Sequence, residues 1–150
     1  MAGMQVHASA VAVGEAGLLI LGGPGSGKSD LALRLIDRGA LLVADDRVDL
    51  AVADGRLVAT APPPLLGLIE MRGVGIVERP VQRAAALALA VHLGQEAERL
   101  PRARTVLYLG VALPVLFLPA FEAATPLKVE EGLRLALAGR LFAHEGPPGG

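Results

Sequence analysis

The chain has 150 residues, of which 53% are hydrophobic and only 3% aromatic, and its formal net charge at pH 7 is −1. The near-neutral charge argues against nucleic acid as the main partner, because nucleic-acid-binding domains carry strongly basic surfaces. The lack of cysteine excludes disulfides and thiolate metal sites. A chain of this length can bury an aliphatic core as one domain, which we assign to residues 1–144. The glycine- and proline-rich end, 145–150, is predicted to be a disordered tail.

No apolar stretch reaches the roughly 18 residues that a membrane-spanning helix needs. Residues 1–7 also lack the basic start and the long apolar segment of a secretion signal. The sequence therefore predicts no membrane partner and a cytoplasmic location.

The first part of the chain predicts a β-hairpin followed by a helix. The β-branched residues of 6–13 and the apolar run 18–21 are typical of strands. The turn residues at 14–17 predict that these strands pair in antiparallel fashion. A helix is expected to begin at Lys28 and to end near Gly39, which suits a left-handed C-terminal cap.

The middle of the chain predicts further strands. The apolar run 41–44 is expected to form a buried strand. Asp54-Gly55 is a strong signal for a tight hairpin turn, with its strands at 48–53 and 56–60.

The later strands are harder to define from the sequence. The stretch 65–77 is apolar and rich in glycine, which predicts an exposed, shaped loop. Residues 83–93 combine alanines that favour a helix with alternating leucines that favour a strand, and we predict a strand. Strands are also expected at 105–109 and 111–118, with the second interrupted at Pro114.

A C-terminal helix is expected from residue 125 to about residue 142. Thr125 suits the N-cap position, and Pro126 suits the first helical position. The combined pattern is that of an α/β fold with a mixed sheet.

One glycine-rich motif follows the predicted strand at 18–21 and precedes the first helix. It matches the pattern G-x-x-x-x-G-K-[ST] over Gly22, Gly23, Pro24, Gly25, Ser26, Gly27, Lys28 and Ser29. Backbone N–H groups and the helix N-terminus would bind phosphate oxygens, Lys28 would reach the β- and γ-phosphates, and the Ser29 hydroxyl would ligate Mg²⁺. The alternative is a glycine-rich turn before a helix, but the strand–loop–helix context favours a nucleotide-phosphate site.

Two further places carry acidic residues that could serve phosphate transfer. Asp45 and Asp46 end a predicted strand, and ligands bind where the strands of an α/β sheet end. Neighbouring strand residues point to opposite faces, so we expect one of the two to face the phosphates; a plain Asp-Asp turn is the alternative. Glu70 stands in an apolar stretch, either as a metal ligand or as the partner of Arg72 on the same strand face. His7 would lie close to the phosphate loop if the first hairpin forms, although a lone histidine on a strand is usually structural.

In this order the motifs resemble those of the catalytic domain of the HPr kinase/phosphorylase family. That family carries a strand histidine, a G-K-S loop followed by an acid, A-D-D at a strand end and a loop of the form L-x-G-L-x-E-x-R-G-x-G-I. This chain has His7, Gly27-Lys28-Ser29-Asp30, Ala44-Asp45-Asp46 and the stretch 65–76. The resemblance extends over residues 5–80 of the sequence.

The resemblance implies an enzyme that uses ATP and Mg²⁺ to phosphorylate a serine of HPr, the phosphocarrier protein of the phosphotransferase system. Asp46 is the implied acceptor of the serine proton. Arg99 is the nearest match to a catalytic arginine in a polar E-x-x-R-L connection. In full, the resemblance implies His7, Lys28, Asp46 and Arg99 as catalytic residues and Ser29 and Glu70 as metal ligands.

The resemblance also implies a fold and an assembly. The fold would be a compact α/β domain related to the nucleotide-binding core of phosphoenolpyruvate carboxykinase, with a β-hairpin leading into the phosphate loop. Members of the family form hexamers through this domain, which predicts a homo-oligomer.

Two departures from the family pattern limit what the resemblance implies. We expect a catalytic domain without the family's N-terminal domain, as in short alphaproteobacterial-type members. Longer members carry a P-V-R-P-G-R-N loop that serves the removal of phosphate from serine, whereas residues 118–128 here contain no arginine and only Lys128 as a cation. The resemblance therefore does not extend to the phosphorylase reaction or to the helix contact that builds the hexamer.

Two other functions remain compatible with the motifs. The chain could be a small-molecule kinase, or a module that senses ATP without catalysis. Its short length leaves little room for a lid or a substrate domain, which favours a protein substrate. A GTP switch is disfavoured because the sequence contains no N-K-x-D motif for reading guanine.

Overall fold

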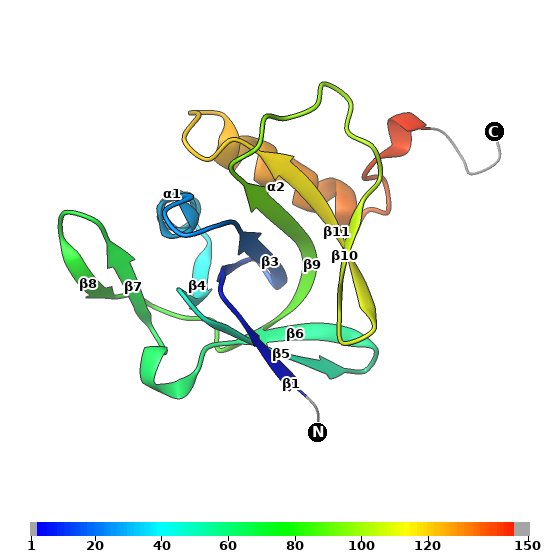
Figure 1. The fold of residues 1–150 in the computed structure, drawn as a ribbon. Helices are drawn as coiled ribbons and strands as arrows, with labels where there is room; N and C mark the ends of the chain where they lie inside the picture. The colour runs from blue at the N-terminus through cyan, green and yellow to red at the C-terminus, as the bar shows by residue number, and fades with distance from the viewer. Residues whose placement is uncertain (1–2, 146–150) are drawn as a thin grey trace.

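The chain forms a curled mixed sheet that carries two helices (Figure 1). The structure is a computed structural model and describes residues 3–145. The strands are β1 (Gly3–Val6), β2 (Ser9–Val13), β3 (Ala16–Leu21), β4 (Leu41–Ala44), β5 (Val48–Ala53), β6 (Arg56–Thr60), β7 (Leu68–Met71), β8 (Gly75–Glu78), β9 (Ala84–Leu93), β10 (Thr105–Tyr108) and β11 (Val111–Leu118). The helices are α1 (Lys28–Asp37) and α2 (Thr125–Leu137), and 3₁₀ turns lie at Pro63–Leu65 and Ala143–Glu145.

Strand β9 is the centre of the main sheet, whose order is β1-β5-β6-β9-β3-β2-β4. Its first residues pair with β6 in antiparallel fashion, and its last residues pair with β11 in parallel fashion. Strand β3 pairs with β9 in parallel fashion along most of the length of β9. Because β9 exchanges one partner for another along its length, the sheet curls around it. The expected strand over 83–93 is therefore confirmed.

The hairpin that leads into the glycine-rich motif is also confirmed. Strands β2 and β3 pair in antiparallel fashion, with Val13 opposite Ala16 next to the turn. Strand β3 ends at Leu21, and the glycine loop, which we define as residues 22–29, connects it to α1. Asp54 and Gly55 both have positive φ, as a type I′ turn requires, and they join β5 to β6 as predicted.

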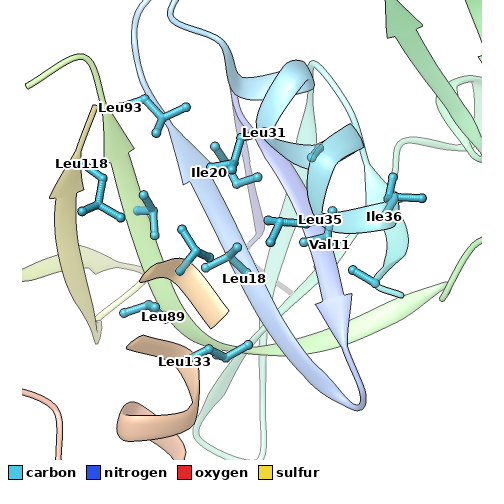
Figure 2. Packing of buried hydrophobic residues seen from close by; sticks show 14 of the residues in the cluster. Val11, Leu18, Ile20, Leu31, Leu35, Ile36, Leu89, Leu93, Leu118 and Leu133 are labelled. Atoms are coloured by element: carbon cyan, nitrogen blue, oxygen red, sulfur yellow. The ribbon is translucent and has the colours of Figure 1, made fainter. Parts of the chain in front are cut away.

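The core lies on both faces of the sheet because successive strand residues point to opposite faces. Leu18 and Ile20 of β3 face the helices and pack with Leu31 and Leu35 of α1 (Figure 2). Leu19, between them, packs into a second cluster under the curled half of the sheet, with residues of β5 and β6. Burial on both faces holds β3 in place, and β3 in turn fixes where the glycine loop begins.

Each helix is followed, two residues after its last residue, by a glycine with positive φ. Gly39 follows α1, with its N–H bonded to the Ile36 carbonyl, which confirms the expected end of that helix. Gly139 ends α2 in the same way, so α2 stops at Leu137 and the expectation of a helix to about residue 142 was wrong. The glycine at position 139 is a sequence signal that could have predicted the true end of α2. Neither described helix is long and apolar enough to cross a membrane.

The structure also corrects three expectations about strands. The strand expected over 6–13 is broken, because β1 pairs with β5 while β2 pairs with β3, and the chain bends at residues 7–8 to pass between them. The stretch 65–77, expected to be an exposed, shaped loop, instead contains most of the hairpin formed by β7 and β8. Strand β11 runs through Pro114, because its pairing with β9 begins only at Val115 and the missing N–H leaves no gap in that ladder. Residues 146–150 of the expected tail lie outside the described residues.

The leucines of α2 allow a test of how strongly this helix packs on the sheet. Leu133 is 2% exposed in the core, and Leu137, one turn later, is 60% exposed. We expect Leu133→Ala to lower the free energy of unfolding by about 2–5 kcal/mol, because it leaves a cavity under β9. The matched variant Leu137→Ala should change it by less than about 0.5 kcal/mol. Urea denaturation measures both, and equal effects would contradict the observed orientation of α2.

Candidate active site

The glycine loop is tightly folded at its two ends. A Cβ atom added to Gly22 would lie 2.3 Å from the Ser26 hydroxyl oxygen, so any larger residue would disrupt the loop. At Gly27, where φ is 100°, an added Cβ would lie 2.8 Å from the ring of Phe121. Gly27 is also the N-cap residue of α1, and it turns the loop into the first turn of the helix. Glycine is therefore required at both positions by space and by backbone conformation.

Lys28 is one of the buried polar or charged side chains of residues 3–145. Its Nζ atom donates hydrogen bonds of 2.9 Å to the carbonyl oxygens of Gly22 and Gly23. An ammonium group has three donors, so these two bonds hold the side chain against the loop and leave one donor for a ligand. This arrangement suits the binding of a phosphate oxygen at the loop.

Asp45 is the buried carboxylate of the site, with 4% of its surface exposed. Oδ1 accepts hydrogen bonds of 2.7 Å from the hydroxyl groups of both Ser9 and Ser29. Oδ2 accepts a bond of 3.0 Å from the backbone N–H of Glu70. One carboxylate thus joins the end of β4 to β2, to the start of α1 and to β7. Sequence reasoning noticed the acidic pair but did not assign this role to Asp45 or any role to Ser9.

Asp46 points the other way, because the backbone turns sharply at this residue. Its φ is 69°, in the left-handed region that Asp and Asn tolerate better than most residues. The side chain is 59% exposed, and Oδ1 lies 3.2 Å from Nε2 of His7. The bend between β1 and β2 therefore carries His7 to Asp46, which brings together two of the predicted catalytic residues.

A cavity of about 460 Å³ opens beside these groups. Most of the predicted site residues line it, together with apolar side chains that sequence reasoning did not single out. Its lining consists of His7, Ser9, Pro24, Gly25, Ser26, Gly27, Lys28, Ser29, Asp30, Leu33, Asp46, Glu70, Met71, Arg72, Val74 and Phe121. Gly22 and Gly23 do not line the cavity themselves, but their carbonyl groups hold Lys28 at its edge.

Arg99, unlike Gly22 and Gly23, has no contact with a residue of this cavity through a hydrogen bond or ion pair among the described residues. It lies in the exposed connection between β9 and β10 and does not contribute to the lining. Lys128, which the sequence offered as a substitute for missing arginines, lines a second cavity of about 440 Å³ between α2 and the C-terminal turn. Its Nζ lies 3.8 Å from a carboxylate oxygen of Glu122.

The residues present fit a magnesium ion that is shared with phosphates. Mg²⁺ is bound by one or two carboxylates, with waters and phosphate oxygens completing its octahedron. The Ser29 hydroxyl lies beside the Asp45 carboxylate, and Glu70 lines the same cavity. Within residues 3–145 no group of three His, Asp or Glu side chains is placed to hold a metal ion by itself. Glu70 and Arg72 form no ion pair in that part of the chain.

The far side of the cavity is built from the turn that follows β11. Arg34 of α1 bridges to this turn, because its guanidinium donates to the carbonyl oxygens of Ala120 and Glu122. Arg34 also lies 3.0 Å from Asp30, one helical turn earlier. These contacts place Phe121 against Gly27. No local signal in the sequence indicated that residues 118–124 would reach the glycine loop.

The fold and the cavity define an α/β domain in which a glycine loop at a helix N-terminus faces carboxylates and a histidine. The family model of the HPr Serine kinase C-terminal domain matches residues 1–124. The chain therefore belongs to this family, and the resemblance inferred from the motifs is confirmed.

Known relatives agree with this assignment. The HPr kinase/phosphorylase of Clostridium botulinum (strain Eklund 17B / Type B) is 43% identical over 74 residues, which are 49% of this chain and 24% of the relative. That of Clostridium novyi (strain NT) is 34% identical over 139 residues, which are 89% of this chain and 45% of the relative. The chain thus spans less than half the length of these curated relatives.

A solved structure has the same fold. The structure of the Hpr(Ser) kinase/phosphatase from Coxiella burnetii superimposes with a TM-score of 0.79 and 29% sequence identity. The match covers 95% of this chain and 97% of that chain. The expected α/β fold with a mixed sheet is therefore confirmed.

The two neighbouring acids provide a matched test of the site's construction. We expect Asp45→Asn to lower the free energy of unfolding by about 1–3 kcal/mol, because an amide nitrogen would face a hydrogen-bond donor in a buried place. Asp46→Asn should change stability by less than about 1 kcal/mol, since it alters only an exposed contact with His7. Thermal unfolding of the two variants checks this difference. Equal stability would show that Asp45 does not join the four segments.

Proposed function

We propose that this chain is a protein serine kinase domain that transfers the γ-phosphoryl group of ATP, with Mg²⁺, to a serine of HPr. The observation that carries the proposal is the single cavity in which the glycine loop, Lys28 and Ser29 face Asp46 and His7. Membership of the HPr Serine kinase C-terminal domain family supports HPr as the acceptor. The rival functions, a small-molecule kinase and a non-catalytic ATP sensor, have no comparable support.

The glycine loop would bind the triphosphate of ATP. If so, the fold is the nucleotide-binding core that the resemblance implied, and it is related to the core of phosphoenolpyruvate carboxykinase. Backbone N–H groups of the loop and the N-terminus of α1 provide partial positive charge, and Lys28 adds a full charge. Lys28 is already held at the loop by two carbonyl groups, so little ordering is needed when a phosphate binds.

Ser29 and Glu70 would hold Mg²⁺, and the ion, when bound, offsets negative charge on the β- and γ-phosphates. Asp45 supports both ligands from behind. Its carboxylate orients the Ser29 hydroxyl and the backbone of Glu70 through bonds of 2.7 and 3.0 Å. Asp45 thereby fixes the distance between β7 and the start of α1.

Asp46 would accept the proton of the incoming serine hydroxyl. As that proton moves to the Asp46 carboxylate, the serine oxygen forms a bond to the γ-phosphorus and the bond to the β-phosphate oxygen breaks, releasing ADP. His7 lies 3.2 Å from Asp46 Oδ1 and holds the carboxylate in a defined orientation. Arg99 remains a prediction from the resemblance, since the connection that carries it does not line the cavity.

The location and the assembly are part of the same proposal. An ATP-dependent kinase that acts on a phosphocarrier protein would work in the cytoplasm, without nucleic acid or membrane as a partner. The resemblance further suggests a homo-oligomer, with a hexamer as the form known in the family. Light scattering of the purified protein measures this directly.

Substitution of Asp46 should separate binding from transfer. We expect Asp46→Asn to lower transfer from labelled ATP to HPr by about 100-fold or more, because general-base assistance is lost. ATP affinity measured by calorimetry should stay close to wild type. Asp49→Asn, the same change on the surface of β5, is the matched control and should leave transfer intact. Full activity of Asp46→Asn would remove the proposed base, and transfer to a metabolite panel but not to HPr would favour a small-molecule kinase.

Substitution of Lys28 should weaken binding and transfer together. In Lys28→Ala the loop loses its cation, so both ATP affinity in calorimetry and phosphorylation of HPr should fall. Unchanged ATP affinity would contradict the proposed role of the glycine loop.

The reverse reaction should be weak in this chain. Removal of phosphate from serine by inorganic phosphate needs a site for a second anion. Residues 118–128 contain no arginine, and Lys128 lies near Glu122 at another cavity. We expect phosphorylated HPr to keep its label when inorganic phosphate is added, and rapid loss of label would show that another cation serves this step.

A further inference from the structure

Phe121 is an exposed aromatic ring in the wall of the candidate active site. The whole chain contains only three phenylalanines, one tyrosine and no tryptophan. Among the described residues, Phe121 is the only Phe or Tyr that lines this cavity, and it is 69% exposed. A large apolar ring left open to water at the edge of a cavity that also holds charged groups is a feature that binding of a flat apolar group would explain.

The turn that carries Phe121 is held firmly. Arg34 donates to the backbone carbonyl groups on either side of Phe121, those of Ala120 and Glu122. The Thr125 hydroxyl, which is buried, donates a bond of 2.7 Å to the Pro119 carbonyl and closes the turn from the other end. The backbone of the turn therefore has a defined position, and it holds the ring beside the glycine loop.

That place is the junction between the glycine loop and α1. The ring of Phe121 approaches Gly27 so closely that an added Cβ there would lie 2.8 Å from Cζ. The reacting groups belong to other elements, because Asp46 and His7 lie at the ends of β4 and β1, and Glu70 lies on β7. In Figure 1 the β7–β8 hairpin and the turn after β11 lie on different sides of α1. Asp46 and Glu70 thus reach the cavity from segments other than the turn that carries the ring, while the Asp30 carboxylate, also in the lining, is paired with Arg34.

A nucleoside triphosphate has a charged triphosphate at one end and a flat aromatic base at the other, which suits a cavity with charged groups and an aromatic ring. The lysine of such a loop binds the β- and γ-phosphates, and the backbone N–H groups of the loop bind the α- and β-phosphates. The base lies beyond the α-phosphate, away from the transferred group. We propose that Phe121 is the stacking platform for the nucleobase of ATP in this chain. This assignment rests on the proposed function, since it presumes that the glycine loop binds the triphosphate.

An apolar surface of the protein acceptor is the other occupant that the ring could meet. Val74 and Ile76, at the tip of the β7–β8 hairpin, are also exposed and apolar, and Val74 lines the same cavity. They extend from the hairpin that carries Glu70, so they suit contacts with the acceptor. Phe121 extends from a different turn and rests on the glycine loop, which favours the nucleobase.

Binding of ATP and of tripolyphosphate, both with Mg²⁺, tests the proposal, because tripolyphosphate lacks a base. We expect Phe121→Ala to weaken ATP by about tenfold or more, the scale of one base–aromatic stack, and to leave tripolyphosphate unchanged. Leu107→Ala is the matched control, since Leu107 is also 69% exposed and lies on β10, outside the cavity. Calorimetry measures all affinities, and thermal unfolding confirms that each variant is folded.

A fluorescence measurement reads the contact directly. The chain has no tryptophan, so Phe121→Trp introduces a single reporter at the ring position. ATP should quench its emission while tripolyphosphate should not, and Leu107→Trp should respond to neither. This variant keeps an aromatic ring, so ATP affinity should be close to that of the wild type.

The outcomes distinguish the failure of this proposal from that of the proposed function. If the wild-type protein binds ATP and tripolyphosphate but Phe121→Ala binds both as well as wild type, the stacking platform is refuted and nucleotide binding stands. A raised KM for HPr in that variant would then assign Phe121 to the acceptor. If Phe121→Ala loses affinity for ATP and for tripolyphosphate equally, the ring only supports the glycine loop, and the stacking platform is again refuted. If the wild-type protein binds neither ligand, the proposed function itself fails.

Discussion

The buried carboxylate of Asp45 is the interaction on which the site depends. Its two oxygens accept hydrogen bonds from Ser9, Ser29 and the backbone of Glu70, which belong to three elements besides its own. A buried charge is costly unless it is paired or hydrogen-bonded, and here three donors stabilise it. The same bonds position the residues that would hold metal and phosphate. Stability of the fold and geometry of the site therefore rest on one side chain.

The backbone separates the tasks of two neighbouring acids. Positive φ at Asp46 turns its side chain away from Asp45, so that one carboxylate is buried and the other opens into the cavity beside His7. Three donors inside the protein occupy the Asp45 oxygens, whereas the exposed Asp46 carboxylate is open to an incoming hydroxyl group. In the proposed kinase, Asp45 provides structure and Asp46 provides chemistry.

The cavity is assembled from four parts of the chain that lie far apart in the sequence. The β2–β3 hairpin and β9 place the glycine loop, the end of β4 supplies the acids, the β7–β8 hairpin supplies Glu70, and the turn after β11 supplies Phe121. Arg34 and Asp45 attach two of these parts to α1. Charged groups and an aromatic ring thus face one space, which suits a ligand with a charged end and a flat end.

Local patterns were sufficient to predict the hairpin before the glycine loop, the loop itself, α1 with its glycine cap, and the turn at Asp54-Gly55. Each of these depends on backbone preferences and hydrogen bonds between residues close in sequence, which the residue types determine. Tertiary structure decided which of the two acids is buried, that the first strand breaks at His7, and that Phe121 reaches Gly27 while Arg99 stays outside the cavity. These features depend on pairing and packing between segments far apart in the chain, and no local pattern carries that information.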